Sequence, residues 1–144
     1  MIKVRLLRPE GKAPTVAHPG EDLGYDVYAA EAVTIPARGG AIVPTGISVE
    51  LVSDAGRPMG ALIRDRSSLA VRHIIATAGV IDSGYRGEIR IVMENLGDTP
   101  FEVHVGDKIA NLIPYPVLTS TVEIVEELAE SSRAAGGFGS TGRK

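Results

Sequence analysis

Short apolar runs separated by turn-forming residues constrain the fold of this chain more than any other feature. Seventeen glycines and nine prolines are spread through the 144 residues rather than gathered in one linker. An apolar run recurs roughly every ten residues, a spacing typical of a sandwich, jelly roll or barrel. Aromatic residues are only 4% and Trp is absent, so the core must consist mainly of Val, Ile, Leu and Ala. Such a composition favours sheets over helices. We therefore expect an all-β, jelly-roll-like barrel or sandwich.

Ten strands are predicted from these runs and the turns between them. The alternation is clearest in the run that ends at Glu94, where Ile89, Ile91 and Met93 should share one face. The predicted strands cover residues 3–7, 26–30, 32–35, 41–51, 59–64, 74–81, 88–94, 101–105, 108–117 and 121–125.

One short helix and a C-terminal tail depart from the strand pattern. Residues 66–73 carry serines at an expected N-cap position, and they predict a helix of two turns at most. The last residues are small, basic and rich in glycine, so they cannot build a core. We expect a β domain over residues 1–130 and a flexible segment over 131–144.

Composition excludes several classes of function. A formal net charge of −3 gives no basic footprint for nucleic acid. No apolar run approaches the ~18 residues that span a bilayer, and no secretory signal is visible. The absence of cysteine excludes disulfides, Cys-ligated zinc and thiol catalysis. We expect a cytoplasmic protein that binds neither nucleic acid nor membrane.

Several polar residues stand where they could carry chemistry. Asp82 follows an apolar run and precedes a Ser-Gly turn, so its carboxylate could activate a water as a general base, or it could be an ordinary turn residue. Tyr85 in the same turn could form a flat wall for a sugar or simply lie on the surface. Asp26 offers an oxygen ligand that suits magnesium through a water, or it could be a solvent-facing strand carboxylate.

Two further groups suit phosphate. Arg66 with Ser67 and Ser68 combines a guanidinium, two hydroxyls and backbone N–H groups, although a capped surface helix would look the same. In the tail, one aromatic residue stands among glycines between a cation and two hydroxyls, which suits a lid as well as a disordered end. The three histidines show no metal-ligand spacing.

Taken together, five blocks of the chain resemble the trimeric dUTP pyrophosphatase (dUTPase) family, in that family's order and over nearly the whole length. The blocks are DLGYDVYAA at residues 22–30, RSSLA at 66–70, GVIDSGYRG at 79–87, GDKIANLI at 106–113 and RAAGGFGSTG at 133–142. The third and fifth blocks are the most specific.

The resemblance implies a dUTPase-like β-clip fold and a homotrimer with three sites shared between subunits. It implies magnesium-assisted hydrolysis of dUTP to dUMP and pyrophosphate, by attack of water on the α-phosphorus. Such an activity keeps uracil out of DNA and supplies dUMP for thymidylate synthesis. Phosphoryl transfer needs positioning and charge neutralisation more than covalent help, which fits these residue types.

The resemblance also implies a role for each matching residue. Asp82 would activate the water, and Asp26 would hold magnesium through water. The uracil and the sugar would be bound by Gly79, Val80, Ile81, Arg90 and Tyr85. The phosphates would be contacted by Arg66, Ser67, Ser68 and Asn111, and the tail would close through Arg133, Phe138, Gly139, Ser140 and Thr141, with Phe138 stacked on uracil.

Three blocks depart from the family's pattern, at four positions. Asp65 and Ser68 flank Arg66 and Ser67 where the family usually has Pro and Gly, and Asp65 would bring negative charge near phosphates unless it points away. Gly84 stands where an Asp is frequent, and Asn111 where a Gln is usual.

Two alternatives remain open from sequence alone. A dCTP deaminase shares the fold and some motifs, but its glutamate would fall at Val92, which has no acid–base chemistry, and Glu94 is one pleat repeat away. A catalytically inactive nucleotide-sensing or binding module is the other.

Overall fold

The computed structural model describes residues 1–131 and is almost entirely β structure. Its strands and single helix are β1 (Ile2–Leu6), β2 (Tyr25–Tyr28), β3 (Val33–Ile35), β4 (Gly39–Pro44), β5 (Ile47–Val52), β6 (Pro58–Arg64), α1 (Ser67–Ala70), β7 (Ile74–Thr77), β8 (Val80–Ile81), β9 (Arg90–Asn95), β10 (Phe101–Val103) and β11 (Lys108–Pro116). The predicted all-β fold with one short helix is confirmed.

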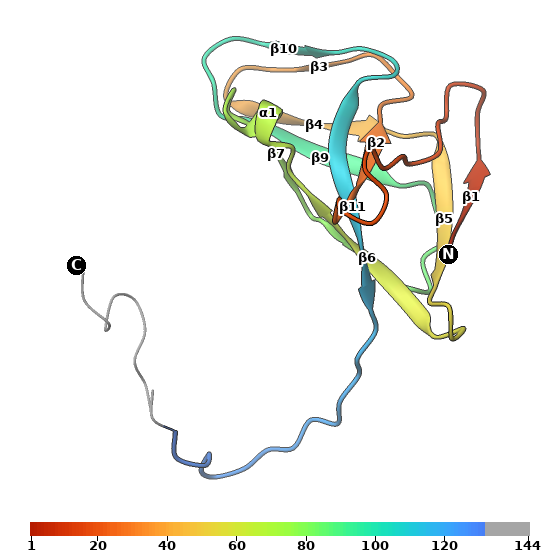
Figure 1. Ribbon diagram of the computed structural model, residues 1–144. Helices are drawn as coiled ribbons and strands as arrows, with labels where there is room; N and C mark the ends of the chain where they lie inside the picture. Colours follow the sequence, from red (N-terminus) through yellow and green to blue (C-terminus); the bar gives the residue numbers. More distant parts are fainter. Residues whose placement is uncertain (132–144) are drawn as a thin grey trace.

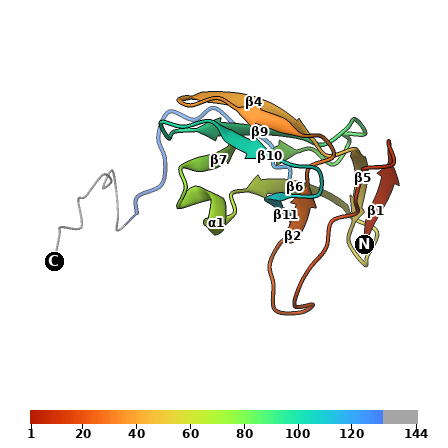
Figure 2. The same ribbon diagram turned by 90° about the horizontal axis from the view of Figure 1, so that it is seen from above.

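The strands form three sheets, and the paired strands within each sheet are antiparallel. The largest has the order β1-β5-β6-β11-β2, with β8 also paired to β6. A second sheet has the order β4-β9-β7, and β10 pairs with β3. Figure 2 shows β4 and β9 on one side of the body and β6, β11 and β2 on the other. Neighbours in these sheets are distant in sequence, as in a jelly roll or sandwich.

One aliphatic core lies between the sheets. Its fully buried members include Val27 of β2, Val43 of β4, Ile47 of β5 and Leu112 of β11. The alternation predicted near β9 is confirmed, because Ile89, Ile91 and Met93 are at most 1% exposed while Arg90 between them is exposed. Burial of such side chains is the main force that holds strands with few local contacts together.

Two predicted strands are each divided in the structure. Residues 41–51 break at Thr45 and Gly46, where Gly46 has a φ of +67° and Thr45 donates a hydrogen bond to the Ile89 carbonyl at 2.6 Å. Residues 74–81 break at Ala78, which has a φ of +52°. A left-handed residue turns the backbone, so an unbroken strand is impossible at either place.

The prediction of serine N-caps is wrong. Arg66 is the N-cap residue of α1, with an extended backbone and no side-chain capping bond, and Ser67 is already helical.

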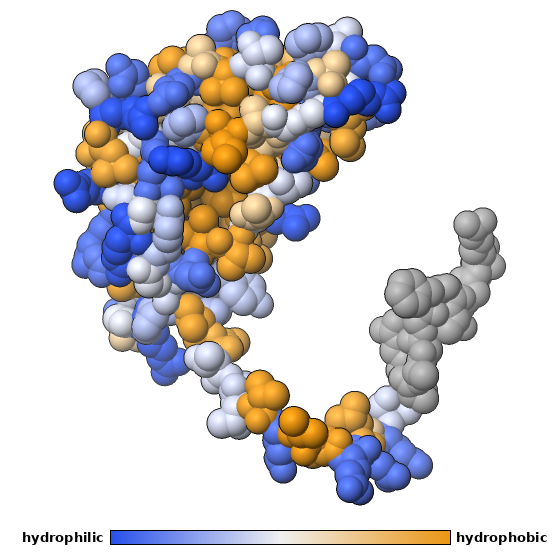
Figure 3. Space-filling model, turned by 180° about the vertical axis from the view of Figure 1, so that it is seen from behind, coloured by the Kyte–Doolittle hydropathy of each residue, from blue (hydrophilic) through white to orange (hydrophobic). Residues whose placement is uncertain are grey.

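The predicted strand over residues 121–125 is also wrong. Within the described residues no strand follows β11, and the side chains of Val122 and Ile124 are 95% and 98% exposed. The chain leaves the body after β11, and Figure 3 shows apolar side chains standing out along this segment. An alternating pattern forms a strand only where another strand edge is available, and no described segment pairs with this one.

Residues 132–144 lie outside the described part, so the flexible tail and the domain boundary after residue 130 stay predictions. Within residues 1–131, no helix is both long and apolar enough to cross a membrane.

Candidate active site

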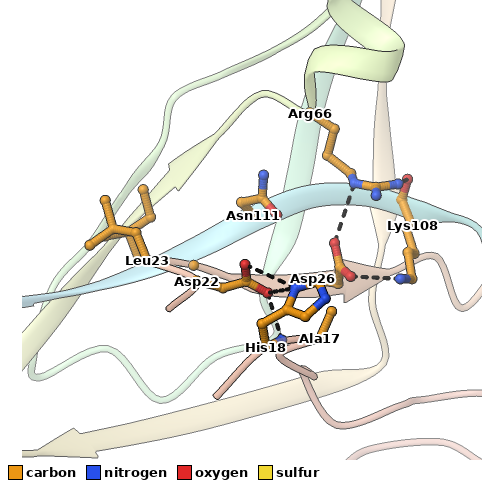
Figure 4. Close-up of a pocket in the computed structure, with 10 residues that line it drawn as sticks. Ala17, His18, Asp22, Leu23, Asp26, Arg66, Lys108 and Asn111 are labelled. Carbon is orange, nitrogen blue, oxygen red and sulfur yellow. Dashed lines mark hydrogen bonds and ion pairs between the residues drawn. The ribbon is translucent and has the colours of Figure 1, made fainter. Parts of the chain in front are cut away.

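A cavity of about 450 Å³ opens beside β2 and β11 (Figure 4). Sheet register explains its composition, because Asn111 of β11 pairs with Asp26 of β2 on one side and with Arg64 of β6 on the other. The chain then turns after β6 and brings Arg66 over the same row. The lining residues are Ala17, His18, Asp22, Leu23, Gly24, Asp26, Arg66, Lys108, Asn111 and Ile113.

Asp26 is the charged centre of this cavity. Its side chain is 14% exposed and faces two cations, with Oδ1 at 3.3 Å from Nε of Arg66 and Oδ2 at 2.7 Å from Nζ of Lys108. The hydrogen bond to Asp26, and next the negative charge of Asp26, raise the pKa of Lys108 above its ordinary value. Arg66 also donates from Nη1 to the Lys108 carbonyl at 3.1 Å. The cluster therefore holds one negative and two positive charges beside an open space.

A loop before β2 forms the other wall. The backbone N–H of His18 donates to the Asp22 carboxylate at 2.8 Å, and this bond is the main cause that lowers the pKa of Asp22. The His18 ring lies against the same carboxylate. Figure 4 shows this pair next to Asp26.

Asp65 does not direct its carboxylate into this cavity. Its Oδ1 accepts a hydrogen bond of 2.6 Å from the backbone N–H of Ala76 in β7. The negative charge of Asp65 therefore does not face the expected phosphate site, because its carboxylate is bonded to the backbone of β7. Asn111 keeps its place in the cavity wall, and its amide reaches the Asp65 carbonyl at 3.4 Å.

A second cavity, of about 470 Å³, collects the residues predicted from the third block except Gly79. It is lined by Val80, Ile81, Asp82, Tyr85, Gly87, Glu88 and Arg90. Asp82 is exposed, and its carbonyl accepts from the Tyr85 N–H at 3.0 Å, which closes a tight turn.

Tyr85 is held firmly although it is 45% exposed. Its hydroxyl donates to the Glu88 carbonyl at 3.0 Å, and the ring lies on Gly87, where any Cβ would overlap it. Gly84 faces open space in the same turn. A Cβ at position 87 would therefore displace the aromatic ring, whereas one at position 84 would meet nothing.

Strand β8 offers main-chain groups to this cavity. It pairs with β6 through Ala61↔Ile81 and Leu62↔Val80, and no described strand pairs with its other edge. Gly79 directs its carbonyl to the Ile63 N–H at 2.7 Å, and a Cβ at Gly79 would overlap the Ile63 carbonyl. Main-chain N–H and C=O groups along this unpaired edge are open to a bound ligand.

The two cavities share no lining residue, although Ile113 of the first and Val80 of the second both pair with Leu62 of β6. Asp82 follows Ile81, whose carbonyl lies against Gly60 near the start of β6. Arg66 lies two residues beyond the end of this strand, at Arg64. Gly60 and Arg64 are four residues apart, which is roughly 13 Å along a strand. One chain therefore brings Asp26, Arg66 and Asn111 together and holds Asp82, Tyr85 and Arg90 elsewhere.

Sequence reasoning missed three charged residues at these cavities. Lys108 lies inside the fourth block but was given no role, Glu88 lines the second cavity, and Arg8 pairs with Glu88. Their partners are up to 82 residues away in sequence, so only the folded structure reveals them. The tail residues Arg133, Phe138, Gly139, Ser140 and Thr141 fall outside the described residues.

Solved structures establish the fold class. A Staphylococcus bacteriophage 80alpha dUTPase solved with dUPNHPP matches with a TM-score of 0.89 and 25% identity, and the match covers 99% of each chain. A dUTPase mutant from phage phi11 of S. aureus, whose structure describes the coordination of a structural Mg(II) ion, matches with a TM-score of 0.79 and 24% identity over 90% of this chain and 99% of that one. This β architecture is that of the dUTPase fold.

Sequence comparison gives the family. The dUTPase family model matches residues 10–142. A deoxyuridine 5'-triphosphate nucleotidohydrolase of Candida albicans is 44% identical over 99% of this chain and 88% of its own length. The chain belongs to the dUTPase family. The predicted enzyme class, a dUTP diphosphatase, is confirmed by these relatives.

The deaminase alternative is not favoured. The position of the deaminase glutamate is occupied by Val92, which pairs with Ile42 of β4 and Thr77 of β7 and has no acid–base group. The Glu94 carboxylate lies against Gly40 of β4.

Proposed function

We propose that this chain hydrolyses dUTP to dUMP and pyrophosphate, with Asp82 as the general base. The observation that carries the proposal is that Asp26, Arg66 and Asn111 line one cavity together with Lys108, while Asp82, Tyr85 and Arg90 line another beside a strand edge that no described strand pairs with. A water would attack the α-phosphorus, its proton would pass to Asp82, and the bond from that phosphorus to the bridging oxygen would break as pyrophosphate leaves.

The cationic cavity suits the phosphates. Arg66 can shift from Asp26 to a phosphate oxygen, with the exposed hydroxyls of Ser67 and Ser68 on the following turn. Asn111 can add a neutral donor from β11. Lys108, unassigned from sequence, adds a second positive charge within the same wall.

Asp26 fits magnesium only as part of a site shared with the substrate. Residues 1–131 contain no group of three His, Asp or Glu side chains that could hold a metal alone. Magnesium commonly uses one carboxylate together with waters and substrate phosphates, and Asp26 supplies such a carboxylate at the cavity wall. Bound there with the triphosphate, the ion would neutralise phosphate charge. Lys108 would lose its bond to Oδ2 of Asp26 when magnesium and the triphosphate bind.

The second cavity suits uracil and deoxyribose. Val80 and Ile81 line this cavity and can offer main-chain donors and acceptors, whereas the carbonyl of Gly79 is already bonded to Ile63. Cytosine would leave such groups unpaired at about 1–3 kcal/mol each. Tyr85, fixed on Gly87, would lie against the sugar and leave no room for a 2′-hydroxyl. Arg90 projects from β9 at the cavity's edge.

A homotrimer with shared sites completes the proposal. Because the two cavities share no lining residue, we infer that a site that uses both takes Arg66 and Asp82 from different copies. The C-terminal block would close over the nucleotide, with Phe138 and Gly139 on uracil, and Arg133, Ser140 and Thr141 on the phosphates. That last assignment rests on the motif alone.

A panel of dUTP, dCTP, dTTP and UTP with magnesium tests the function. Pyrophosphate release should be confined largely to dUTP and should stop when EDTA is added. The unfolding temperature should stay unchanged, because residues 1–131 contain no side-chain group that could hold a metal alone. Ammonia from dCTP would establish a deaminase instead. Binding of dUTP without turnover would indicate an inactive module.

A further inference from the structure

Glu88 is the least exposed carboxylate at the second cavity. It lies one residue after Gly87, and its side chain is only 9% exposed. Oε1 accepts from the Gly46 N–H at 2.9 Å and from Nη2 of Arg8 at 3.1 Å, while Oε2 accepts from Nε of Arg90 at 3.2 Å. A carboxylate shielded from water is stable only with such donors.

The backbone around Glu88 is equally constrained. The N–H of Ile89 donates to the Ile47 carbonyl at 2.8 Å, and Thr45 donates to the Ile89 carbonyl from both its N–H and its hydroxyl. Ile89 itself is fully buried. The backbone from which the Glu88 side chain projects therefore has a fixed position.

Two proposed substrate-binding groups depend on this one residue. Arg90 is exposed over 62% of its side chain, and its Nε–H contact with Glu88 is the one ion pair that the described residues give it. Tyr85 donates to the Glu88 main-chain carbonyl. A long, exposed arginine has many rotamers of similar energy, so an anchored partner decides where its guanidinium lies.

We propose that Glu88 is a positioning residue for the nucleoside end of the site. The Glu88 carboxylate orients Arg90 across the mouth of the second cavity, and the Glu88 main-chain carbonyl accepts the hydrogen bond that holds the Tyr85 ring. Arg8 keeps the carboxylate in place from the N-terminal segment, and its other terminal nitrogen is paired with Glu31. This role rests on the proposed function, since it concerns binding of the same dUTP.

The variant E88Q tests this role because it keeps the shape and removes the charge. The amide can still accept from Gly46, but its NH₂ group then faces the N–H donors of Arg90 or Arg8. The KM for dUTP should rise roughly tenfold, with kcat changed by less than about threefold, because Arg90 is released while Asp82 is untouched. E31Q is the matched control. It removes the other carboxylate on Arg8, far more exposed at 48%, and should leave KM unchanged.

A double-variant cycle separates positioning from general support. If Glu88 acts through Arg90, E88Q should raise KM in the wild-type chain but not in a chain that already carries R90Q. A full additional loss in the R90Q background, or a wild-type KM in E88Q, overturns the proposal. If E88Q does not fold, Arg90→Lys decides the matter. It keeps the charge but lacks the Nε–H donor, so its KM should rise as in R90Q, and a wild-type KM contradicts the role. No dUTP turnover in the wild-type protein would instead overturn the proposed function.

Discussion

Lys108 and Asp26 form the closest pair of opposite charges at the candidate phosphate site, with Nζ 2.7 Å from Oδ2. The hydrogen bond to Asp26 raises the pKa of Lys108 above 10.5. The folded chain then holds this proton more tightly than the unfolded chain does. The pair's contribution to stability is complete below pH 10.5 and is lost as the pH rises through the raised value.

A comparison of variants at high pH measures that contribution. Lys108→Met should unfold at a slightly lower temperature than wild type at neutral pH, because the pair is partly exposed, and the difference should vanish well above pH 10.5. Lys108→Arg keeps its charge in that range and should retain the pair. A difference between wild type and Lys108→Met that stays constant across the whole range would show that the pair does not form in solution.

Asp82→Asn should lower kcat by about 10²–10⁴-fold, since the amide cannot accept a proton from the attacking water. Binding of a non-hydrolysable dUTP analogue, measured by calorimetry, should stay close to wild type. Asp54→Asn, at an exposed turn away from the second cavity, is the control and should be fully active. Substantial residual turnover in Asp82→Asn would remove this residue from the base role.

Gly87→Ala should weaken discrimination against UTP by roughly tenfold, because the added Cβ displaces the Tyr85 ring that excludes a 2′-hydroxyl. Gly84→Ala is a close match in the same turn, and its Cβ would meet nothing within 4 Å. The ratio of kcat/KM for dUTP and UTP checks both variants. Equal ratios in Gly87→Ala and wild type would mean that Tyr85 does not set sugar selectivity.

Deletion of residues 133–144 should leave the fold and the assembly intact while lowering kcat/KM by about 100-fold or more, because positioning of the triphosphate is lost. Circular dichroism and light scattering check the first part and kinetics the second. Removal of Arg143 and Lys144 alone, beyond the fifth block, should have little effect. Aggregation of the longer deletion would indicate a structural tail.

Local patterns were sufficient for much of the fold. The alternation of Ile89, Ile91 and Met93 predicted a half-buried strand, because strand periodicity is a property of neighbouring residues. The breaks at Gly46 and Ala78 were missed because apolar side chains continue on both sides of each turn. The strand expected near Val122 was wrong because its pattern says nothing about which edge, if any, it meets.

The candidate site, like the fold, was predictable from sequence only in part. The motifs assigned Asp26 to magnesium and Arg66 and Asn111 to the phosphates, and register across β2, β11 and β6 brings the three into one cavity. Lys108 and Glu88 act through pairings between distant segments, which a single sequence does not encode in any readable spacing. The separation of Asp82 from Arg66 along β6 is likewise a consequence of topology.

That separation makes mixed assemblies the most direct test of the whole account. Arg66→Ala and Asp82→Asn should each be nearly inactive alone. If each site takes Arg66 from one copy and Asp82 from another, mixed oligomers, verified by native mass spectrometry, should recover dUTP hydrolysis, because some sites receive both wild-type residues. Verified mixed oligomers that remain as inactive as the parent variants would contradict a site shared between chains.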